Sequence, residues 1–302
     1  MVIEKVLLVY NPKAGNGIFA GNLDKVIAAF QRKKKLIVPV RIDQGIKLDQ
    51  IFKNAGNFSK VIAAGGDGTV HAVVGAMVEN GVDIPLALLP AGTANDLAHY
   101  FGIPTQFKKM LDIATSGKRV RMDVGMANGR PFVNVLAAGV MVDASQKTDP
   151  VAKNTFGLAA YYIKALSELP KLHPIPVKIT LPDEVIEAEM NAILILNGRG
   201  AGGLKSVAPQ SVIDDGLLEV LLVHNVPFVN WGTLALSILT GQHENSEFLS
   251  FYSTPSIRIE AEEDLVTDLD GEAGMPLPVD ISVLHRRIEI CVPREYGVED
   301  EE

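Results

Sequence analysis

The sequence predicts a two-domain protein, in which an N-terminal α/β domain with a parallel sheet precedes a C-terminal, mainly antiparallel β-sandwich domain. Up to about Val120, short continuous apolar runs alternate with segments of helical spacing, which is typical of a parallel sheet covered on both faces. Beyond that point, the segments are mostly strand-like and are separated by Gly, Pro, Asn and Asp. The 302 residues suffice for two domains, each with its own core.

The elements of the first half follow from apolar runs and helical spacing, in chain order. The predicted strands are Val6–Asn11, Leu36–Ile42, Lys60–Gly65 and Ile84–Pro90. The predicted helices are Leu23–Lys34, Gly68–Asn80 and Thr93–Gly102. In such sheets ligands bind beyond the carboxyl ends of the strands. Three loops fall there, with the sequences NPKAGNG, GGDGT and PAGTAND.

The second half contains two apolar stretches and one helical insert that need separate interpretation. Gly157–Leu172 has helical spacing and interrupts the strands. Val226–Leu239 is too short to span a bilayer and contains Pro227, so we expect it to form a helix, or a strand and helix, packed in the core. We also expect the aromatic residues of Glu247–Pro255 to be core, although both stretches suit a lipid-binding groove.

Composition excludes several classes of function. The net charge of −8 argues against nucleic acid as a partner, because neutralising phosphates requires a basic surface. The basic run Arg32–Lys35 is interpreted as the solvated end of a helix. A single cysteine, Cys291, excludes an intramolecular disulfide and argues against a cysteine-based zinc site. The first residues do not resemble a signal peptide, so a cytoplasmic location is expected.

The GGDGT loop raises a question of charge. Glycines after a strand let backbone N–H groups approach phosphate oxygens, and the helix N-terminus that follows adds partial positive charge. Asp67 would repel phosphate in that position unless a divalent cation lay between them, and Mg²⁺ is bound in this way. The alternative is a tight turn in which Asp67 acts as an N-cap. The pentapeptide alone leaves both interpretations open.

The two other loops support a nucleotide site. NPKAGNG offers a small-residue turn with a cation, Lys13, but it has neither Walker A nor dinucleotide-binding spacing. PAGTAND places Thr93, Asn95 and Asp96 after a strand. Asp96 is either a first-turn acid that suits the helix dipole or a second carboxylate of the same metal network.

Together these motifs resemble the diacylglycerol kinase catalytic-domain family, in particular its bacterial lipid kinases that lack membrane spans. The resemblance rests on NPKAG, GGDGT and GTANDLA, and it extends to the stretches Ala208–Val223 and Asp268–Gly274. It covers nearly the whole chain. GGDGT alone is weak, because NAD kinases share it and phosphofructokinases have a similar sequence. The resemblance implies an N-terminal fold like that of those enzymes.

The resemblance also implies roles for particular residues. Asp67 and Asp96 would hold Mg²⁺ on ATP, and Glu272 of the Asp-Gly-Glu motif would be the general base, so these three are the expected catalytic residues. The residues expected to bind ATP are Asn11, Pro12, Lys13, Ala14, Gly15, Gly65, Gly66, Asp67, Gly68, Thr69, Gly92, Thr93 and Asn95. A separate structural Mg²⁺ site is implied at Val212, Asp215 and Leu217. Lys153 is a further candidate cation.

The resemblance assigns the domains as well. We expect a nucleotide-binding domain at residues 1–122, completed by the C-terminal segment 286–302, and a lipid-substrate domain at residues 123–285. Two departures from the family pattern bear on activity. His71-Ala72 stands where the family commonly has Asn-Glu, and Asp43-Gln44 stands where a threonine is usual at the end of the second strand.

We therefore expect an ATP- and Mg²⁺-dependent kinase that phosphorylates a lipid hydroxyl, most simply that of diacylglycerol, to give phosphatidic acid. Its partners would be ATP and a lipid at the inner face of the cell membrane, with transient peripheral association; a homodimer is left open. One alternative is an enzyme like NAD kinase with a soluble substrate, against which GTANDLA and Asp-Gly-Glu argue. The other is a catalytically weak nucleotide- or lipid-binding relative, which His71-Ala72 keeps open.

Overall fold

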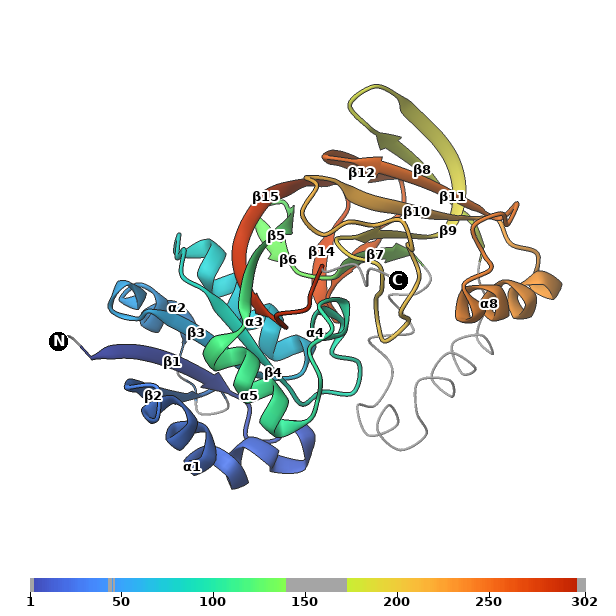
Figure 1. Cartoon of the computed structure of the whole chain (residues 1–302). Helices are drawn as coiled ribbons and strands as arrows, with labels where there is room; N and C mark the ends of the chain where they lie inside the picture. Colours follow the sequence, from blue (N-terminus) through green and yellow to red (C-terminus); the bar gives the residue numbers. More distant parts are fainter. Residues whose placement is uncertain (1–2, 43–44, 46, 140–172, 298–302) are drawn as a thin grey trace. The chain divides into compact units, whose positions relative to one another are not determined.

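The computed structural model describes residues 3–42, 45, 47–139 and 173–297. Its contacts divide the chain into two units, residues 1–124 with 286–302 and residues 125–285. The predicted helix Gly157–Leu172, the candidate cation Lys153 and the departure at Asp43-Gln44 lie outside the described residues. The expected fold class is confirmed, since the first unit is α/β with parallel strands and the second is an antiparallel β-sandwich (Figure 1).

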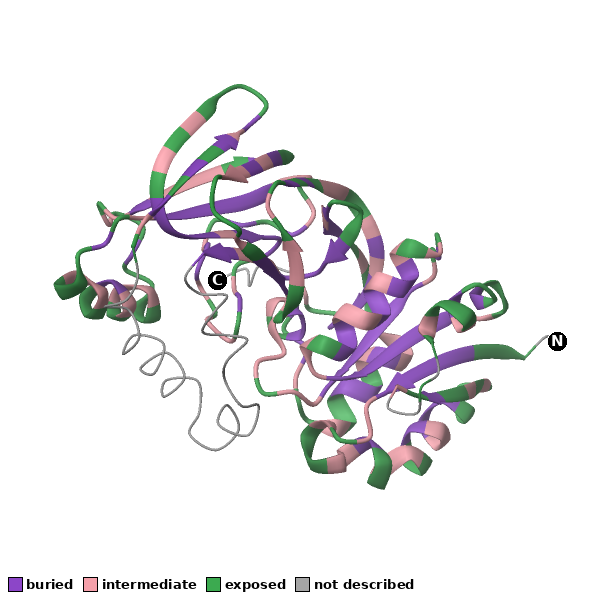
Figure 2. Cartoon of the chain, turned by 180° about the vertical axis from the view of Figure 1, so that it is seen from behind, coloured by how far each residue is buried: buried purple, intermediate pink, exposed green. Residues whose placement is uncertain are grey.

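The first unit is built on four parallel strands in the order β2-β1-β3-β4. Their bounds are β1 Glu4–Tyr10, β2 Lys35–Arg41, β3 Lys60–Gly65 and β4 Leu86–Pro90. β3 and β4 are buried along their whole length and β1 is buried from Val6 to Tyr10, because both faces of the sheet are covered, and Figure 2 shows these strands mainly as buried ribbons. β15 (Val279–Val292) joins β4 in parallel through Ile290 and Leu86, and β5 (Lys118–Ala127) pairs with β15.

Five helices surround this sheet in two packed groups. They are α1 Ile18–Gln31, α2 Leu48–Phe52, α3 Asp67–Glu79, α4 Asp96–Tyr100 and α5 Phe107–Ser116. α1 contacts α5, and α2 contacts α3, on opposite faces of the sheet (Figure 1). The Arg32–Lys35 run lies at the end of α1, as expected, and Arg32 to Lys34 are exposed.

The second unit is antiparallel in every described pair of its strands. Its strands, beyond the shared β5 and β15, are β6 Arg130–Phe132, β7 Val135–Gly139, β8 Ile175–Thr180, β9 Val185–Leu196, β10 Leu218–His224, β11 Leu249–Thr254, β12 Ser256–Ala261, β13 Val266–Leu269 and β14 Glu272–Pro276. β9 pairs with β8 through its first half and with β7 and β10 through its second half, so one strand serves both layers. A core of Leu, Ile and Val side chains fills the space between them.

The apolar stretch Val226–Leu239 corrects an expectation. It forms a 3₁₀ turn, Phe228–Asn230, and the helix α8, Trp231–Thr240, but only part of it is core. Leu234 is buried, whereas the side chain of Val229 is 83% exposed. The helix therefore presents apolar side chains to solvent as well as to the core. The aromatic residues of Glu247–Pro255 are closer to the expectation, because Phe248, Phe251 and Tyr252 are half-buried and pack against the hydrophobic core clusters. Within the described residues, no helix is both long and apolar enough to span a bilayer.

Truncating the central strand of the parallel sheet should cost more stability than truncating its edge. Leu7 on β1 is fully buried, whereas Leu36 on the edge strand β2 is 41% exposed. We expect Leu7→Ala to lower the free energy of unfolding by about 2–5 kcal/mol through the lost apolar contacts and the cavity. The matched change Leu36→Ala should lower the free energy of unfolding by much less than Leu7→Ala does. Urea denaturation of both variants measures the difference, and equal losses would contradict the burial described here.

Lys60 should make stability depend on alkaline pH. It is 4% exposed, and its ammonium donates a 2.6 Å hydrogen bond to the carbonyl of Ala114. Burial lowers the pKa of Lys60, and nearby Cys291 acts in the opposite direction. The unfolded chain therefore holds this proton up to higher pH, so folding is favoured as pH rises toward the ordinary lysine pKa of 10.5.

Replacing Lys60 with methionine keeps the length of the side chain and removes its proton. The stability of the native chain relative to Lys60→Met should rise between neutral pH and about pH 10. Exposed Lys53→Met is the matched control and should show no such trend. The check is the urea midpoint measured across that pH range. A flat difference between native and Lys60→Met would contradict the assigned effect of burial.

Candidate nucleotide and phosphoryl-transfer site

The three predicted loops lie together at the carboxyl ends of β1, β3 and β4. The strand order reverses between β1 and β3, which is where sheets of this kind bind ligands. The amide of Asn11 donates to the carbonyl of Ala64, and the amide of Ala91 donates to the carbonyl of Gly65. Gly15 packs against Ala91, since a Cβ on Gly15 would lie 3.0 Å from the Ala91 Cβ. The first loop therefore touches the third, and each is bonded to the end of β3.

Two glycines bring the second and third loops into backbone contact. A Cβ added to Gly92 would lie 2.6 Å from the Cα of Gly66 and 2.9 Å from Oδ1 of Asn95. No side chain fits at Gly92 without moving backbone, so the close approach itself requires glycine. Asn95 locks the turn from within, because its Oδ1 accepts from the Gly92 amide and its Nδ2 donates to the Gly92 carbonyl, each at 2.7 Å.

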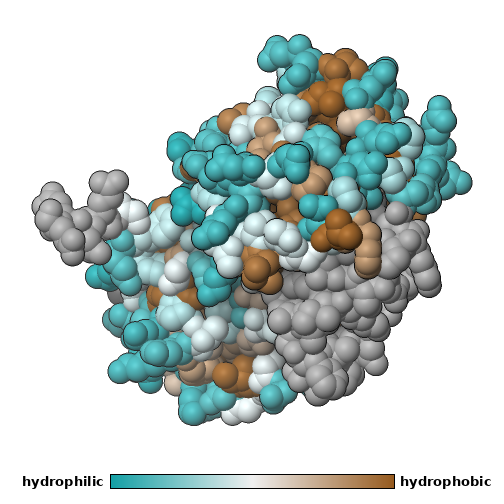
Figure 3. Space-filling model, turned by 90° about the vertical axis from the view of Figure 1, so that its right-hand side faces the viewer, coloured by the Kyte–Doolittle hydropathy of each residue, from teal (hydrophilic) through white to brown (hydrophobic). Residues whose placement is uncertain are grey.

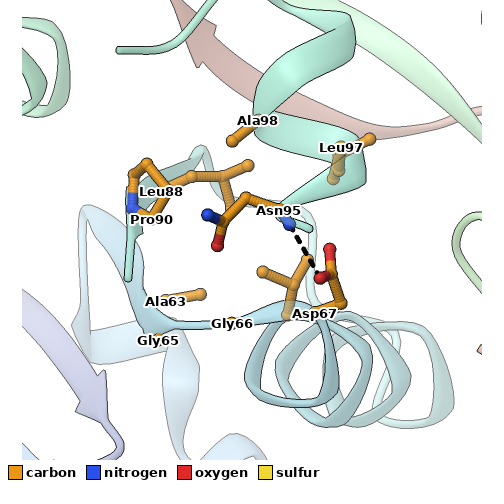
Figure 4. Close-up of a pocket in the computed structure, with 10 residues that line it drawn as sticks. Ala63, Gly65, Gly66, Asp67, Leu88, Pro90, Asn95, Leu97 and Ala98 are labelled. Atoms are coloured by element: carbon orange, nitrogen blue, oxygen red, sulfur yellow. Dashed lines mark hydrogen bonds between the residues drawn. The ribbon is translucent and has the colours of Figure 1, made fainter. Parts of the chain in front are cut away.

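Asp67 bridges these loops with both carboxylate oxygens. Oδ2 accepts the backbone amide of Asn95 at 2.9 Å (Figure 4). Oδ1 accepts that of Asp96 at 2.7 Å. The expectation that Asp67 is an N-cap is wrong for its own helix, because Gly66 is the N-cap of α3 and Asp67 is the first helical residue. The Asp67 carboxylate instead satisfies two amides at the start of α4. Its position within its own helix, in the first turn of α3, also suits a negative charge.

The bridge explains why an acid occupies a phosphate-binding type of loop. This structural role leaves room for the predicted cation, because each carboxylate oxygen has a further lone pair after accepting one N–H. A half-buried carboxylate already fixed by two amides is pre-oriented toward a cation approaching from solvent. Ala63, Leu88 and Ala98 line the hollow beside it, together with Pro90 and Leu97 (Figure 4).

The structure distributes the other predicted nucleotide residues between solvent and core. Lys13, Gly15, Gly68 and Thr93 are exposed on the loops. Asn11, Pro12, Ala14, Gly66, Gly92, Asn95 and Asp96 are half-buried. Thr69 differs, because it is only 4% exposed. It packs against Gly65 so closely that a Cβ added to Gly65 would lie 2.2 Å from the hydroxyl oxygen of Thr69. The Thr69 side chain therefore packs beneath the GGDGT loop, and its backbone belongs to the first turn of α3.

Glu272 lies in the second unit, exposed at the start of β14. The turn before it is held by a residue that sequence analysis passed over, Asp270. Its carboxylate accepts three backbone amides, those of Val133 at 2.6 Å, Asn134 at 2.7 Å and Val135 at 2.9 Å. Asp270 has a positive φ of 55°, and the Gly271 amide bonds to Asp268. The sequence signal for this turn was the position of Asp270 directly before a glycine, where an aspartate often adopts the left-handed backbone conformation.

The predicted structural Mg²⁺ site is a turn before β10. Asp215 is exposed, and its Oδ1 accepts the amide of Leu217 at 2.9 Å, while Val212 is also exposed. A single carboxylate with backbone carbonyls and water suits a hard cation such as Mg²⁺. Among the described residues, no three His, Cys, Asp or Glu side chains gather as a metal cluster. A cation here would therefore depend on carbonyl and water oxygens beside Asp215.

Removing the Asp67 carboxylate should release the third loop. Asp67→Ala leaves the amides of Asn95 and Asp96 without their partners, which costs about 1–3 kcal/mol of stability. We expect faster hydrogen exchange at these two amides, measured by NMR or mass spectrometry, and a lower unfolding midpoint. Asp24→Ala, an exposed acid on α1, is the control and should change neither. Unchanged exchange at Asn95 and Asp96 would contradict the bridging role of Asp67.

Comparison with known proteins agrees with this geometry. Residues 5–127 match the model of the diacylglycerol kinase catalytic domain, and residues 134–292 match that of the YegS C-terminal NAD kinase beta sandwich-like domain. A Bacillus subtilis (strain 168) protein named diacylglycerol kinase is 27% identical, over 97% of this chain and 98% of its own. A Staphylococcus saprophyticus protein of the same name is 26% identical, over 98% of each chain.

A solved structure from Bacillus anthracis str. Sterne, described as a candidate diacylglycerol kinase, superposes with a TM-score of 0.86. Its sequence is 27% identical, and the match covers 97% of this chain and 96% of that one. Likeness in sequence and in fold thus extends over both units and includes the loops at β1, β3 and β4. The chain belongs to the diacylglycerol kinase catalytic-domain family.

Proposed function

We propose that this protein is an ATP- and Mg²⁺-dependent lipid kinase that transfers the γ-phosphoryl group of ATP to the hydroxyl of diacylglycerol, giving phosphatidic acid. The observation that carries the proposal is the Asp67 bridge, which joins the GGDGT and GTAND loops into one rigid edge. Relatives named diacylglycerol kinase, which match nearly the full length of the chain, support the choice of substrate.

The loops supply what a nucleotide triphosphate needs. Exposed Lys13 and the N-terminus of α3 offer positive charge to phosphate oxygens, and Gly66 and Gly92 let the phosphates approach the backbone. Asp67 and Asp96 would hold Mg²⁺, which neutralises the charge that develops on the phosphoryl group during transfer. The departure at His71-Ala72 falls one turn into α3, where both residues are half-buried.

Glu272 would act as the general base. It takes the proton of the lipid hydroxyl as that oxygen attacks the γ-phosphorus, and the bond from the γ-phosphorus to the bridging oxygen of ADP breaks. Asp270, held by three amides, keeps the turn before Glu272 in one conformation. The exposed Glu272 is thereby presented from a fixed β13–β14 turn. Mg²⁺ at Asp215 would stabilise the turn before β10.

The proposal is tested by transfer of labelled γ-phosphate into phosphatidic acid. Native protein with ATP, Mg²⁺ and diacylglycerol vesicles should form labelled phosphatidic acid, and chelation of Mg²⁺ should abolish it. Glu272→Gln should lower kcat by about 10²–10⁴-fold, the range for loss of a general base. Glu262→Gln, an exposed acid of the same unit, is the matched control and should retain activity.

Two outcomes would overturn the assignment. If native protein labels NAD and no lipid, the acceptor is a soluble nucleotide and the NAD kinase-like alternative holds. If ATP binds and nothing is labelled, the chain is a binding relative, and His71-Ala72 is the place to restore the usual residues. Activity that survives Glu272→Gln at the native level would remove that residue from the mechanism while leaving the kinase assignment intact.

A further inference from the structure

A group of apolar side chains lies exposed on and beside α8. Phe228 is 62% exposed, Val229 83%, Leu236 61% and Leu239 55%; together these four are called the α8 surface. They fall within twelve residues of chain, whereas the other exposed large hydrophobic side chains of the described part are scattered over the rest of both units. In Figure 1 α8 is the orange helix at the margin of the second unit.

The helix is apolar on two faces, which a helix at the surface of a monomer does not need. Leu234 is buried, and Trp231 and Ile238 pack with it against the core, so spacings of three and four residues fix the inward face. Leu236 and Leu239 occupy the other face. The inward face alone accounts for the packing of α8, so the outward apolar residues require a different explanation.

Two hydroxyls of α8 bond to the backbone of the helix itself. The hydroxyl of Ser237 donates to the carbonyl of Leu234 at 2.7 Å, and that of Thr240 donates to the carbonyl of Leu236 at 2.9 Å. Hydroxyls bonded to the preceding turn cost less to desolvate than unbonded ones. These two side chains therefore oppose contact with hydrocarbon only weakly.

Charge distinguishes this surface from the rest of the chain. The chain carries a net charge of −8, yet Asn225–Gln242 contains no ionisable residue. Figure 3 views the molecule from the side on which α8 is drawn in Figure 1, and on its coloured part hydrophilic and hydrophobic residues are interspersed. Anionic headgroups repel a chain of net negative charge, and a segment without ionisable residues avoids that repulsion. The α8 surface provides one.

Area argues against a second copy of the chain as the occupant. Four side chains at these exposures present on the order of 400 Å², a patch of the size typical of functional surfaces on monomers. A stable protein interface needs about 800 Å² from each partner. With ten residues, α8 is about 15 Å long, too short to cross a hydrocarbon core of about 30 Å and suited to lie at its surface.

We propose that the α8 surface docks the protein on a lipid bilayer, with Phe228, Val229, Leu236 and Leu239 inserted at the boundary between headgroups and acyl chains. This inference rests on the proposed function in one respect, that the acceptor is a bilayer lipid. Binding depends on apolar contact, so it requires no anionic lipid.

The test is flotation of the full-length chain with phosphatidylcholine vesicles, in the absence of ATP. Val229→Ser/Leu236→Ser removes two outward side chains and leaves Leu234 in the core. We expect it to lower the vesicle-bound to free ratio about tenfold or more, because each lost apolar insertion is worth roughly a factor of ten. The matched control is Val185→Ser/Val266→Ser, which removes two exposed side chains from β9 and β13 and should float like native protein.

Folding and activity are read separately. Both double variants should keep the native unfolding midpoint, because the replaced side chains are exposed. Phosphorylation of a short-chain diacylglycerol dissolved as monomers should stay within about twofold of native in both variants, while phosphorylation of vesicle diacylglycerol should fall only in Val229→Ser/Leu236→Ser. If native protein labels no lipid, the proposed function fails, yet flotation still tests the docking surface.

Three results would overturn the docking inference. The first is that native protein does not float with the vesicles. The second is that Val229→Ser/Leu236→Ser floats as well as native protein. The third is that the two double variants lose flotation to the same degree. Light scattering tests the remaining candidate occupant of the α8 surface, a second copy of the chain. A native mass twice that of the chain, reduced to one chain by Val229→Ser/Leu236→Ser with flotation unchanged, assigns the surface to a second copy instead.

Discussion

The nucleotide end of this molecule depends on one carboxylate that accepts two backbone amides. Asp67 belongs to the β3–α3 loop, but the groups it holds belong to the start of α4. Gly66 and Gly92 approach each other at the backbone, and the Asp67 carboxylate holds the two loops together beside that contact. The negative charge in this glycine-rich loop therefore has a structural role of its own, whatever ligand the loop binds.

Much of the first unit could be predicted from the sequence, and the physical reason is strong patterning. β3 was predicted at its observed bounds because Lys60–Gly65 is apolar up to the glycines that end it. Three loops were placed at one edge because parallel strands end there. α5 was missed, although Phe107–Ser116 has clear helical spacing, because it follows the recognised motifs. α8 was predicted as core, because apolar composition does not distinguish an inward face from an outward one.

The contacts within the sites could not be predicted, because they join residues far apart in sequence. No spacing rule indicates that Asp67 accepts the amides of Asn95 and Asp96, or that Asp270 gathers three amides from the β6–β7 connection. The motifs named the acids but not their partners. Asp270 lies inside the Asp-Gly-Glu motif, but the three amides that define its role lie 135–137 residues away in sequence, so the motif alone does not indicate it. The fixed turn is what gives that glutamate a defined position.

The division of the chain has a consequence for its synthesis. β15 enters the first unit only after residue 286, where it places Ile290 beside Leu86 of β4. A ribosome therefore releases β1 to β4 long before the strand that covers the β4 edge exists. Through most of translation that edge exposes unpaired backbone groups, which invite association with other chains. The second unit is contiguous in sequence and can fold before the first is complete, so the nucleotide-binding unit is the last to be finished.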